Sequence, residues 1–419
     1  MYSKINIASL FIFIALLFIG IATGYLASSK LSGAIALSFL IFSGALFWHF
    51  GKNIDETKFV LGFFLVYAML PGMSGINVGG GLPVFRSHRI AAMVLLFYLF
   101  RKGTLIDYFK NFITSKTFNL PIIIFLTSLF ITAYFSRSRG STIFWNISFI
   151  MEYLFIGILA FNAFKTRELQ EKLVSMLIYA GVFLAVLAIY EQYTHHNIFT
   201  IFGVYDPSLA HALQHMERFG GIRTNGPFSH SISHGAYFAL LMPLVLYKFK
   251  KRLPIVLGIL GLFALAILST QSRSAQIGAL MVLGLYFIFG DKKPLLIGGF
   301  FSLPVIIMHL NYFLYRLSIL NPFADNDAML QASSMERARQ FEFYVGIVKK
   351  NIIFGYGWVP APALMRNVNN YQNTIDNFYL MFSYLYGLSG LTTWVILMLA
   401  TIIKPIIMLK QEVLKDQLL

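Results

Sequence analysis

Long runs of apolar residues limit the folds open to this chain more than any other feature. About twelve runs approach the roughly 20 residues that a helix needs to cross a hydrocarbon core. They lie near residues 6–27, 33–50, 59–71, 90–101, 119–135, 143–164, 172–190, 232–247, 253–270, 275–290, 294–310 and 378–403. Lipid tolerates only helices or closed barrels, and runs without polar alternation favour helices. The sequence therefore predicts an all-α polytopic membrane protein with about 12 transmembrane helices, within a range of 10–12.

The composition excludes a soluble protein. Hydrophobic residues make up 58% of the chain and charged residues 12%, and the mean hydropathy is +0.71. A soluble domain of this composition would expose far too much apolar surface. Cysteine is absent, so the sequence offers neither disulfides nor thiolate metal sites. The first apolar run is too long for the core of a signal peptide, so we expect a retained helix and a single membrane domain over residues 1–419.

The positions of lysine and arginine predict how the chain is oriented. Short loops rich in these residues stay in the cytoplasm, and the densest clusters lie at 101–116, 248–252 and 292–293. Placing all of them inside also puts both termini in the cytoplasm. The predicted outer loops are then 72–89, 136–142, 191–231, 269–274 and 311–377. Two of these are long extracytoplasmic loops, namely 191–231 and 311–377.

The five predicted outer loops contain far more arginine than lysine. Their two lysines are Lys349 and Lys350, against eleven arginines: Arg86, Arg89, Arg137, Arg139, Arg218, Arg223, Arg273, Arg316, Arg337, Arg339 and Arg366. Arginine binds phosphate through a planar, bidentate donor pair and keeps its charge at any relevant pH. A polyanionic ligand on the outer face is one interpretation. The alternative is that these side chains reach lipid headgroups from helix ends.

Four stretches on the predicted outer face carry the chemistry. They are RTNGPFSHSISHGAYFALLMPL at 223–244, SRS at 272–274, and the segments 332–358 and 376–391. In this order and spacing they resemble the O-antigen ligase and O-antigen polymerase superfamily of bacterial envelope glycosyltransferases. The resemblance covers residues 170–405, while the earlier helices match only in number and character.

The resemblance implies an enzyme of the bacterial inner membrane whose active site faces the periplasm. Such an enzyme takes a glycan from a polyprenyl diphosphate carrier and joins it to an acceptor sugar. The acceptor is another carrier-linked repeat in a polymerase and a lipid A core in a ligase. The resemblance implies no cofactor and no metal. Membrane lipid, a flippase and a chain-length regulator are the other partners that it suggests, and we expect no nucleic acid.

The resemblance also assigns roles to individual residues. It implies that Arg223 and Arg273 bind the diphosphate, and it matches Arg337 to an arginine in the second long loop. Members of the superfamily often carry His-Asn where this chain has Asp376 and Asn377. They often carry an acidic residue before the final glycine pair, and this chain lacks it. The missing histidine favours a polymerase over a ligase.

The chemistry of the reaction agrees with these residue types. Negative charge develops on the leaving diphosphate, and fixed cationic donors away from bulk water stabilise it. The acceptor hydroxyl must lose a proton, so a carboxylate or an imidazole can act as the base. Asp376 is the first candidate, and Asn377 is a candidate for substrate binding beside it. The alternative role of Asp376 is an ordinary helix N-cap, and one residue can fill both roles.

Histidines in the first long loop compete for the role of base. His230 and His234 are four residues apart around an expected helix start near Ser231 or Ser233. This spacing can build a metal site, but no Glu or Asp lies nearby to complete the usual pattern. Packing or contact with a hydroxyl is the ordinary role of such residues. Acceptor binding or action as the base by His230 or His234 is the functional alternative, and Arg218 is a further candidate for substrate binding.

The second long loop contains an expected amphipathic helix near residues 334–350. A capping box and apolar residues at three- and four-residue spacing predict it. One interpretation is a lid that shields the site and takes no part in the chemistry. In the other, Arg337 and Arg339 near its start bind the substrate diphosphate, since helix N-termini favour anions.

A transporter or flippase of a lipid-linked or anionic solute is the competing class of function. Secondary transporters place ionisable residues inside their helices and often contain two similar halves with broken helices. In this sequence the charges lie mostly at the ends of the predicted spans, and no inverted repeat is visible. The sequence therefore favours an enzyme.

Overall fold

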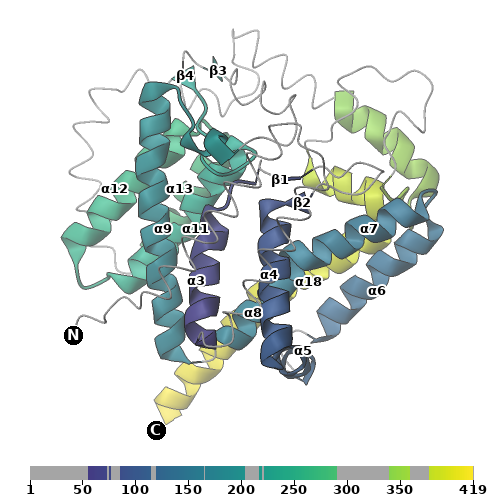
Figure 1. The fold of residues 1–419 in the computed structure, drawn as a ribbon, viewed down its shortest axis with the longest axis horizontal. Helices are drawn as coiled ribbons and strands as arrows, with labels where there is room; N and C mark the ends of the chain where they lie inside the picture. Colours follow the sequence, from purple (N-terminus) through teal and green to yellow (C-terminus); the bar gives the residue numbers. More distant parts are fainter. Residues whose placement is uncertain are drawn as a thin grey trace. The chain divides into compact units, whose positions relative to one another are not determined.

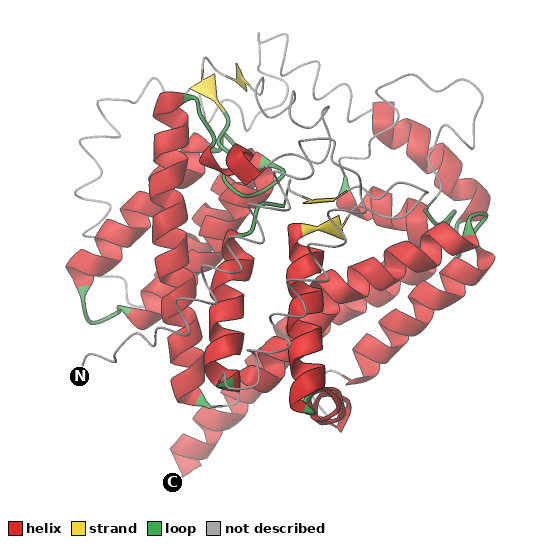
Figure 2. Ribbon diagram, viewed as in Figure 1, coloured by secondary structure: helices red, strands yellow, loops and turns green. Residues whose placement is uncertain are grey.

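The computed structural model describes nine segments of the chain. They are residues 55–72, 75–76, 85–114, 119–164, 166–202, 217–218, 221–289, 339–358 and 377–418. Almost all regular structure in these segments is helical, which confirms the predicted all-α class (Figure 2). The described strands form two antiparallel pairs of two residues each. β1 (Gly75–Ile76) pairs with β2 (Phe85–Arg86), and β3 (Glu217–Arg218) pairs with β4 (Gly221–Ile222).

The chain divides into two compact units, each formed by two stretches of sequence. Unit 1 contains Met1–Ile106 and Phe155–Phe313, and unit 2 contains Asp107–Leu154 and Leu314–Leu419. This division is finer than the single membrane domain that the composition predicts.

Unit 1 is built around α11, which packs against α9, α12 and α13 (Figure 1). α3 packs against both α9 and α4. The described helices of this unit are α3 (Glu56–Met69), α4 (Ser87–Lys102), α8 (Phe155–Ala163), α9 (Arg167–Thr194), the 3₁₀ turn η3 (Ile198–Phe202), α11 (Ser231–Lys248), α12 (Leu253–Ser269) and α13 (Arg273–Phe289).

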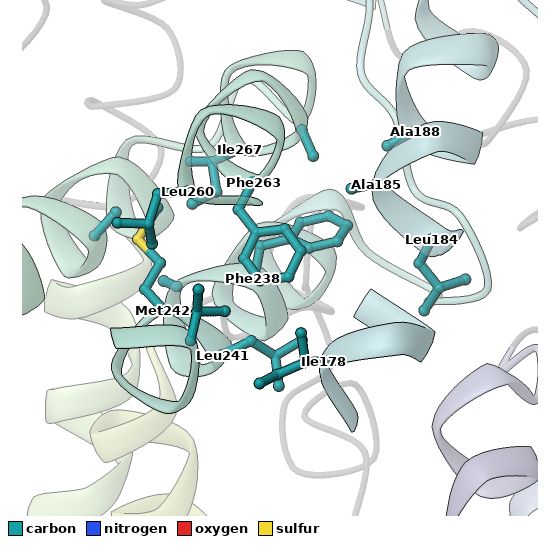
Figure 3. Packing of buried hydrophobic residues seen from close by; sticks show 14 of the residues in the cluster. Ile178, Leu184, Ala185, Ala188, Phe238, Leu241, Met242, Leu260, Phe263 and Ile267 are labelled. Atoms are coloured by element: carbon teal, nitrogen blue, oxygen red, sulfur yellow. The ribbon is translucent and has the colours of Figure 1, made fainter. Parts of the chain in front are cut away.

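The core of unit 1 lies where α9, α11 and α12 meet. The rings of Phe238 and Phe263 are both fully buried, with centroids 5.6 Å apart. Leu184 from α9 and Met242 from α11 belong to the same cluster (Figure 3). Burial of each such side chain contributes roughly 1.5–3 kcal/mol relative to an aqueous reference. This cluster fixes the ends of the three helices, and the candidate site lies at those ends.

Two helix boundaries in unit 1 bear on the predictions from sequence. α11 begins at Ser231, as the sequence predicts. α9 runs from Arg167 to Thr194 and is therefore longer than the expected span of 172–190. Residues 191–194, which the sequence assigns to the first long loop, are the last turn of this helix.

Unit 2 is built around α18, which packs along α6. Its core is rich in aromatic residues and includes Phe125 from α6, Tyr344 and Phe382. Residues 339–348 are helical, within the amphipathic helix expected near 334–350. The other described helices are α5 (Leu105–Thr114), most of which belongs to this unit, α6 (Asn119–Phe135), α7 (Arg139–Phe149), the π-helical turn η2 (Ile150–Leu154), the 3₁₀ turn η4 (Lys349–Asn351) and α18 (Phe378–Leu418).

Some of the described helices have the length and composition of membrane spans. Three of them are long and apolar enough to cross a bilayer, namely Arg139–Phe161, Arg167–Thr194 and Phe378–Ala400. Shorter apolar helices cover Leu120–Phe135, Leu253–Ser269 and Arg273–Ile288. The predicted spans at 6–27, 33–50 and 294–310 lie outside the described residues. The count of about twelve spans therefore stays a prediction.

α18 is interrupted at Gly387, which has a φ of 65° and a ψ of −169°. The segment 352–357 lies along the break and satisfies the backbone groups that the interruption frees. The N–H groups of Leu388 and Ser389 donate to the carbonyls of Ile352 and Ile353, at 2.8 and 3.1 Å. In the other direction, the N–H groups of Tyr356 and Gly357 donate to the carbonyls of Tyr384 and Leu385, at 2.9 and 2.8 Å. Apolar surroundings make such compensation necessary.

We expect Gly387→Ala to destabilise unit 2. The positive φ disfavours any residue with a side chain, and a Cβ at this position would overlap the carbonyl oxygen of Ile353. Backbone strain of this kind costs on the order of 1–3 kcal/mol, and the overlap adds to it. Thermal unfolding of the purified protein in detergent measures the effect.

Gly346→Ala is the matched control, because Gly346 lies in the helical segment of the same unit and a Cβ there would meet nothing within 4 Å. Equal melting temperatures for the two variants would contradict the interpretation of the break.

Candidate functional site

The turn between α12 and α13 is short, polar and buried. It consists of Thr270, Gln271 and Ser272, which are 0%, 4% and 2% exposed. The Thr270 hydroxyl donates to the carbonyl of Ile267 at 2.7 Å and accepts from the N–H of Ser272 at 3.3 Å. Arg273, which the sequence places inside this turn, is the first residue of α13 and is half-buried. The turn therefore gives Arg273 a fixed backbone position.

A second segment, residues 223–226, lies against this turn. The N–H of Thr224 donates to the carbonyl of Ser269 at 3.2 Å, and the two hydroxyl oxygens are 2.9 Å apart. Nε of Arg223 donates to the carbonyl of Thr270 at 3.3 Å. The structure thus brings together the two segments that carry Arg223 and Arg273.

The carboxylate of Glu191 also holds this segment. Glu191 lies in the last turn of α9 and is 4% exposed. Its Oε1 accepts from the N–H of Asn225 at 3.0 Å, and its Oε2 accepts from the N–H of Gly226 at 2.9 Å. A buried carboxylate needs such donors, because an unpaired charge away from water is strongly unfavourable.

The sequence analysis assigns no role to Glu191. It lies three residues after Ala188 and seven after Leu184, both of which are buried on α9. A carboxylate that continues an apolar helical face is a sequence signal for a buried partner. The apolar run ends at residue 190, so the run alone places Glu191 beyond the helix, whereas α9 continues to Thr194.

Gly226 and His234 complete the packing of the segment. Gly226 has a φ of 53°, and a Cβ there would lie 2.6 Å from Cε1 of His234. His234 is 0% exposed, its Nδ1 lies 3.4 Å from the carbonyl oxygen of Thr224, and its ring stacks on Phe228. The side chain of Asn197 donates to the carbonyl of Gly226 at 2.9 Å. His234 therefore lies buried beneath the segment, and its predicted contact with substrate stays a prediction.

The remaining predicted site residues lie in different parts of the two units. In unit 1, His230 is exposed and occupies the N-cap position of α11 without capping it through its side chain, and Arg218 lies in β3. In unit 2, Arg339 is exposed in the helical segment 339–348, and Asn377 caps α18 by accepting from the N–H of Leu380 at 3.1 Å. Arg337 and Asp376 lie outside the described residues.

The described residues contain no group of three or more His, Asp or Glu side chains placed to hold a metal ion. The polar groups of the site are instead one carboxylate, hydroxyls, backbone amides and the two guanidinium groups. Such a set can bind an anion through fixed donors.

Comparison with known proteins agrees with the motifs. Residues 258–395 match the family model described as O-antigen ligase. This range includes the turn with Arg273, the segment 352–357 and the break in α18. No curated protein and no solved structure matches the chain. The family match confirms the resemblance that the four motifs predict.

We expect Thr224 and Ser269 to be coupled energetically. A double-mutant cycle of Thr224→Val and Ser269→Ala should give a coupling free energy of about 0.5–1.5 kcal/mol, because each single change removes the same hydroxyl–hydroxyl contact. Unfolding in detergent is the measurement.

A cycle of Thr224→Val with Ser175→Ala is the control. Ser175 lies on α9 about 24 Å along the helix axis from Glu191, where its hydroxyl bonds only within the helix. The two changes should add, and equal coupling in both cycles would argue against the contact.

Proposed function

We propose that this chain is a membrane enzyme of the O-antigen ligase and polymerase superfamily and that it moves a glycan from a polyprenyl diphosphate carrier to an acceptor sugar. The reaction takes place on the periplasmic face of the inner membrane. The product is a longer carrier-linked glycan, so the enzyme is a polymerase of O-antigen or exopolysaccharide repeats. The alternative is a ligase that joins the glycan to a lipid A core.

The observation that carries the proposal is the attachment of the Arg223 segment to the turn before Arg273. Three hydrogen bonds join them: two link Thr224 to Ser269, the residue before the turn, and one runs from Nε of Arg223 to the carbonyl of Thr270. Two arginines on separate helix ends can bind a diphosphate from two sides, each through a planar pair of donors. The turn and Arg273 also lie within the range matched by the O-antigen ligase family.

Arg223 and Arg273 act on the leaving group. As the bond between the anomeric carbon and the diphosphate oxygen breaks, negative charge accumulates on that oxygen. Donors that are already in position stabilise this charge without having to reorganise. The buried turn supports such a role for Arg273, because its backbone is held by internal hydrogen bonds.

Asp376 acts as the base that takes the proton of the acceptor hydroxyl. The cap of α18 is its neighbour Asn377, whose side chain accepts from the N–H of Leu380. Asn377 therefore occupies the N-cap position of α18, and N-capping was the alternative role for Asp376. Arg337, Arg339 and Asn377 contribute to substrate binding, together with Arg218, His230 and His234.

We expect Arg273→Ala to lower glycan transfer by roughly 10²–10³, because one donor to the developing charge is lost. Arg223→Ala should have a similar effect. Arg273→Lys should restore only part of the activity, because an ammonium group lacks the planar fork. Each variant is expressed in a strain lacking the gene, and surface glycans are separated on a gel.

Arg252→Ala is the matched control, because Arg252 precedes the other end of α12. Loss of long chains with single repeats still attached to core supports a polymerase, whereas loss of every attached repeat supports a ligase. Normal glycans with well-expressed Arg273→Ala protein would rule out the proposed mechanism.

We expect Asp376→Asn to reduce turnover by roughly 10²–10⁴ while donor binding is kept, because the amide cannot accept the proton. Asp107→Asn is the control, since Asp107 is an exposed carboxylate in the first turn of α5. Initial rates with purified enzyme at several donor concentrations separate the maximal rate from the affinity for the donor. An unchanged maximal rate would remove Asp376 from the role of base.

A further inference from the structure

The last turn of α9 contacts both segments of the arginine site through two consecutive side chains. Glu191 binds the segment 223–226, as described above. The amide of Gln192, oriented so that both of its donors are satisfied, donates to the carbonyl of Ile222 at 2.7 Å and to the carbonyl of Ser269 at 3.1 Å. The C-terminal end of α9 therefore contacts Ile222, which precedes Arg223, and Ser269, which precedes the turn that leads to Arg273.

The position of Glu191 is unfavourable for a carboxylate on local grounds. The C-terminal end of a helix carries a partial negative charge, which disfavours an acidic residue in the last turn. Burial to 4% exposure adds a desolvation cost. The N–H groups of Asn225 and Gly226 offset part of both costs, because charge-assisted hydrogen bonds are stronger than neutral ones. A residue that breaks a local rule in this way marks a position under a functional constraint.

The two hydrogen bonds of Glu191 described above act on the backbone of the segment. Two adjacent amides bound to two oxygens of one carboxylate fix both the position and the orientation of the peptide units at Asn225 and Gly226. The positive φ of Gly226 and the buried His234 ring behind it leave the segment little room to shift. The path of the chain two residues earlier, at Arg223, is thereby restricted.

From these contacts we infer that Glu191, assisted by Gln192, is a positioning residue that sets Arg223 against the turn preceding Arg273. The inference rests on the proposed function of the arginine pair. Glu191 itself does not touch the substrate. It stabilises the arrangement in which both guanidinium groups can bind one diphosphate, and displacement of a binding group by about 1 Å can cost up to 100-fold in rate.

Disulfide cross-linking tests the positioning directly, because the natural chain contains no cysteine. Thr224→Cys and Ser269→Cys place thiols where two hydroxyl oxygens lie 2.9 Å apart. In membranes treated with copper phenanthroline, the pair should cross-link rapidly. Adding Glu191→Gln should slow cross-linking by about tenfold, because the amide group presents a donor to a backbone N–H and leaves it without an acceptor.

Glu171→Gln is the matched control for loss of a carboxylate on the same helix. Glu171 lies near the other end of α9, where it forms ion pairs with Arg167 at 3.4 Å and Lys248 at 3.3 Å. This variant should cross-link at the parent rate. If Glu191→Gln does not accumulate in membranes, Gln192→Ala is used instead. It removes the contacts with the carbonyls of Ile222 and Ser269, and its cross-linking rate is measured in the same way.

The link to activity is tested by rescue. Without the cysteines, Glu191→Gln should shorten surface glycans and Glu191→Asp, which keeps the charge, should restore part of their length. In the variant that carries both cysteines and Glu191→Gln, oxidation should lengthen the glycans again, because the disulfide replaces the lost contact. A protein that is merely unstable would not regain activity in this way.

Two results would overturn the inference. One is equal cross-linking rates with and without Glu191→Gln, and the other is full glycan length in Glu191→Gln despite slow cross-linking. A different result separates this inference from the proposed function. If Glu191→Gln slows cross-linking but Arg223→Ala leaves the glycans normal, the arginine mechanism fails while the anchoring of the two segments stands.

Discussion

The need to satisfy polar groups at the ends of apolar helices governs the structure of unit 1. α12 ends at Ser269, α13 begins at Arg273, and the backbone groups between them are buried. Hydrogen bonds of the Thr270 hydroxyl pair some of the backbone groups at the turn. Thr224 and Gln192 supply donors for the carbonyl of Ser269. Buried backbone groups without partners are costly, so these contacts fix which segments must lie side by side. The arginine site follows from that requirement.

Unit 2 meets the same constraint with a broken helix. At Gly387 the ladder of α18 is interrupted, and the segment 352–357 supplies both donors and acceptors to the freed groups. The side chain of Asn351 also donates to the carbonyl of Gly355, which fixes the start of this segment. In both units, residues distant in sequence are held at a helix interruption by backbone hydrogen bonds. Such sites can be rigid although they are formed by loops.

The sequence predicted two of the described helix boundaries of unit 1, because apolar runs and polar boundaries are local properties. The start of α11 at Ser231 and the short turn before α13 both agree with it. The apolar face of α9 indicates that Glu191 is buried, but the sequence could not show that its partners are the amides of Asn225 and Gly226, because these lie in another part of the chain. The break at Gly387 was missed for a similar reason. A single glycine within an apolar run is tolerated in a helix, and its compensating segment lies some 30 residues earlier.

The excess of arginine in the predicted outer loops does not have one cause. Arg137 and Arg139 lie over the rings of Tyr356 and Tyr134, with guanidinium carbons 5.8 and 4.9 Å from the centroids. Such contacts stabilise an exposed helix end by about 0.5–1 kcal/mol and need no ligand. Arg223 differs, because its guanidinium is bound to the backbone of a buried turn that precedes a second arginine. The number of arginines is equally compatible with contact to lipid headgroups, so the proposed diphosphate site rests on this contact and not on the count.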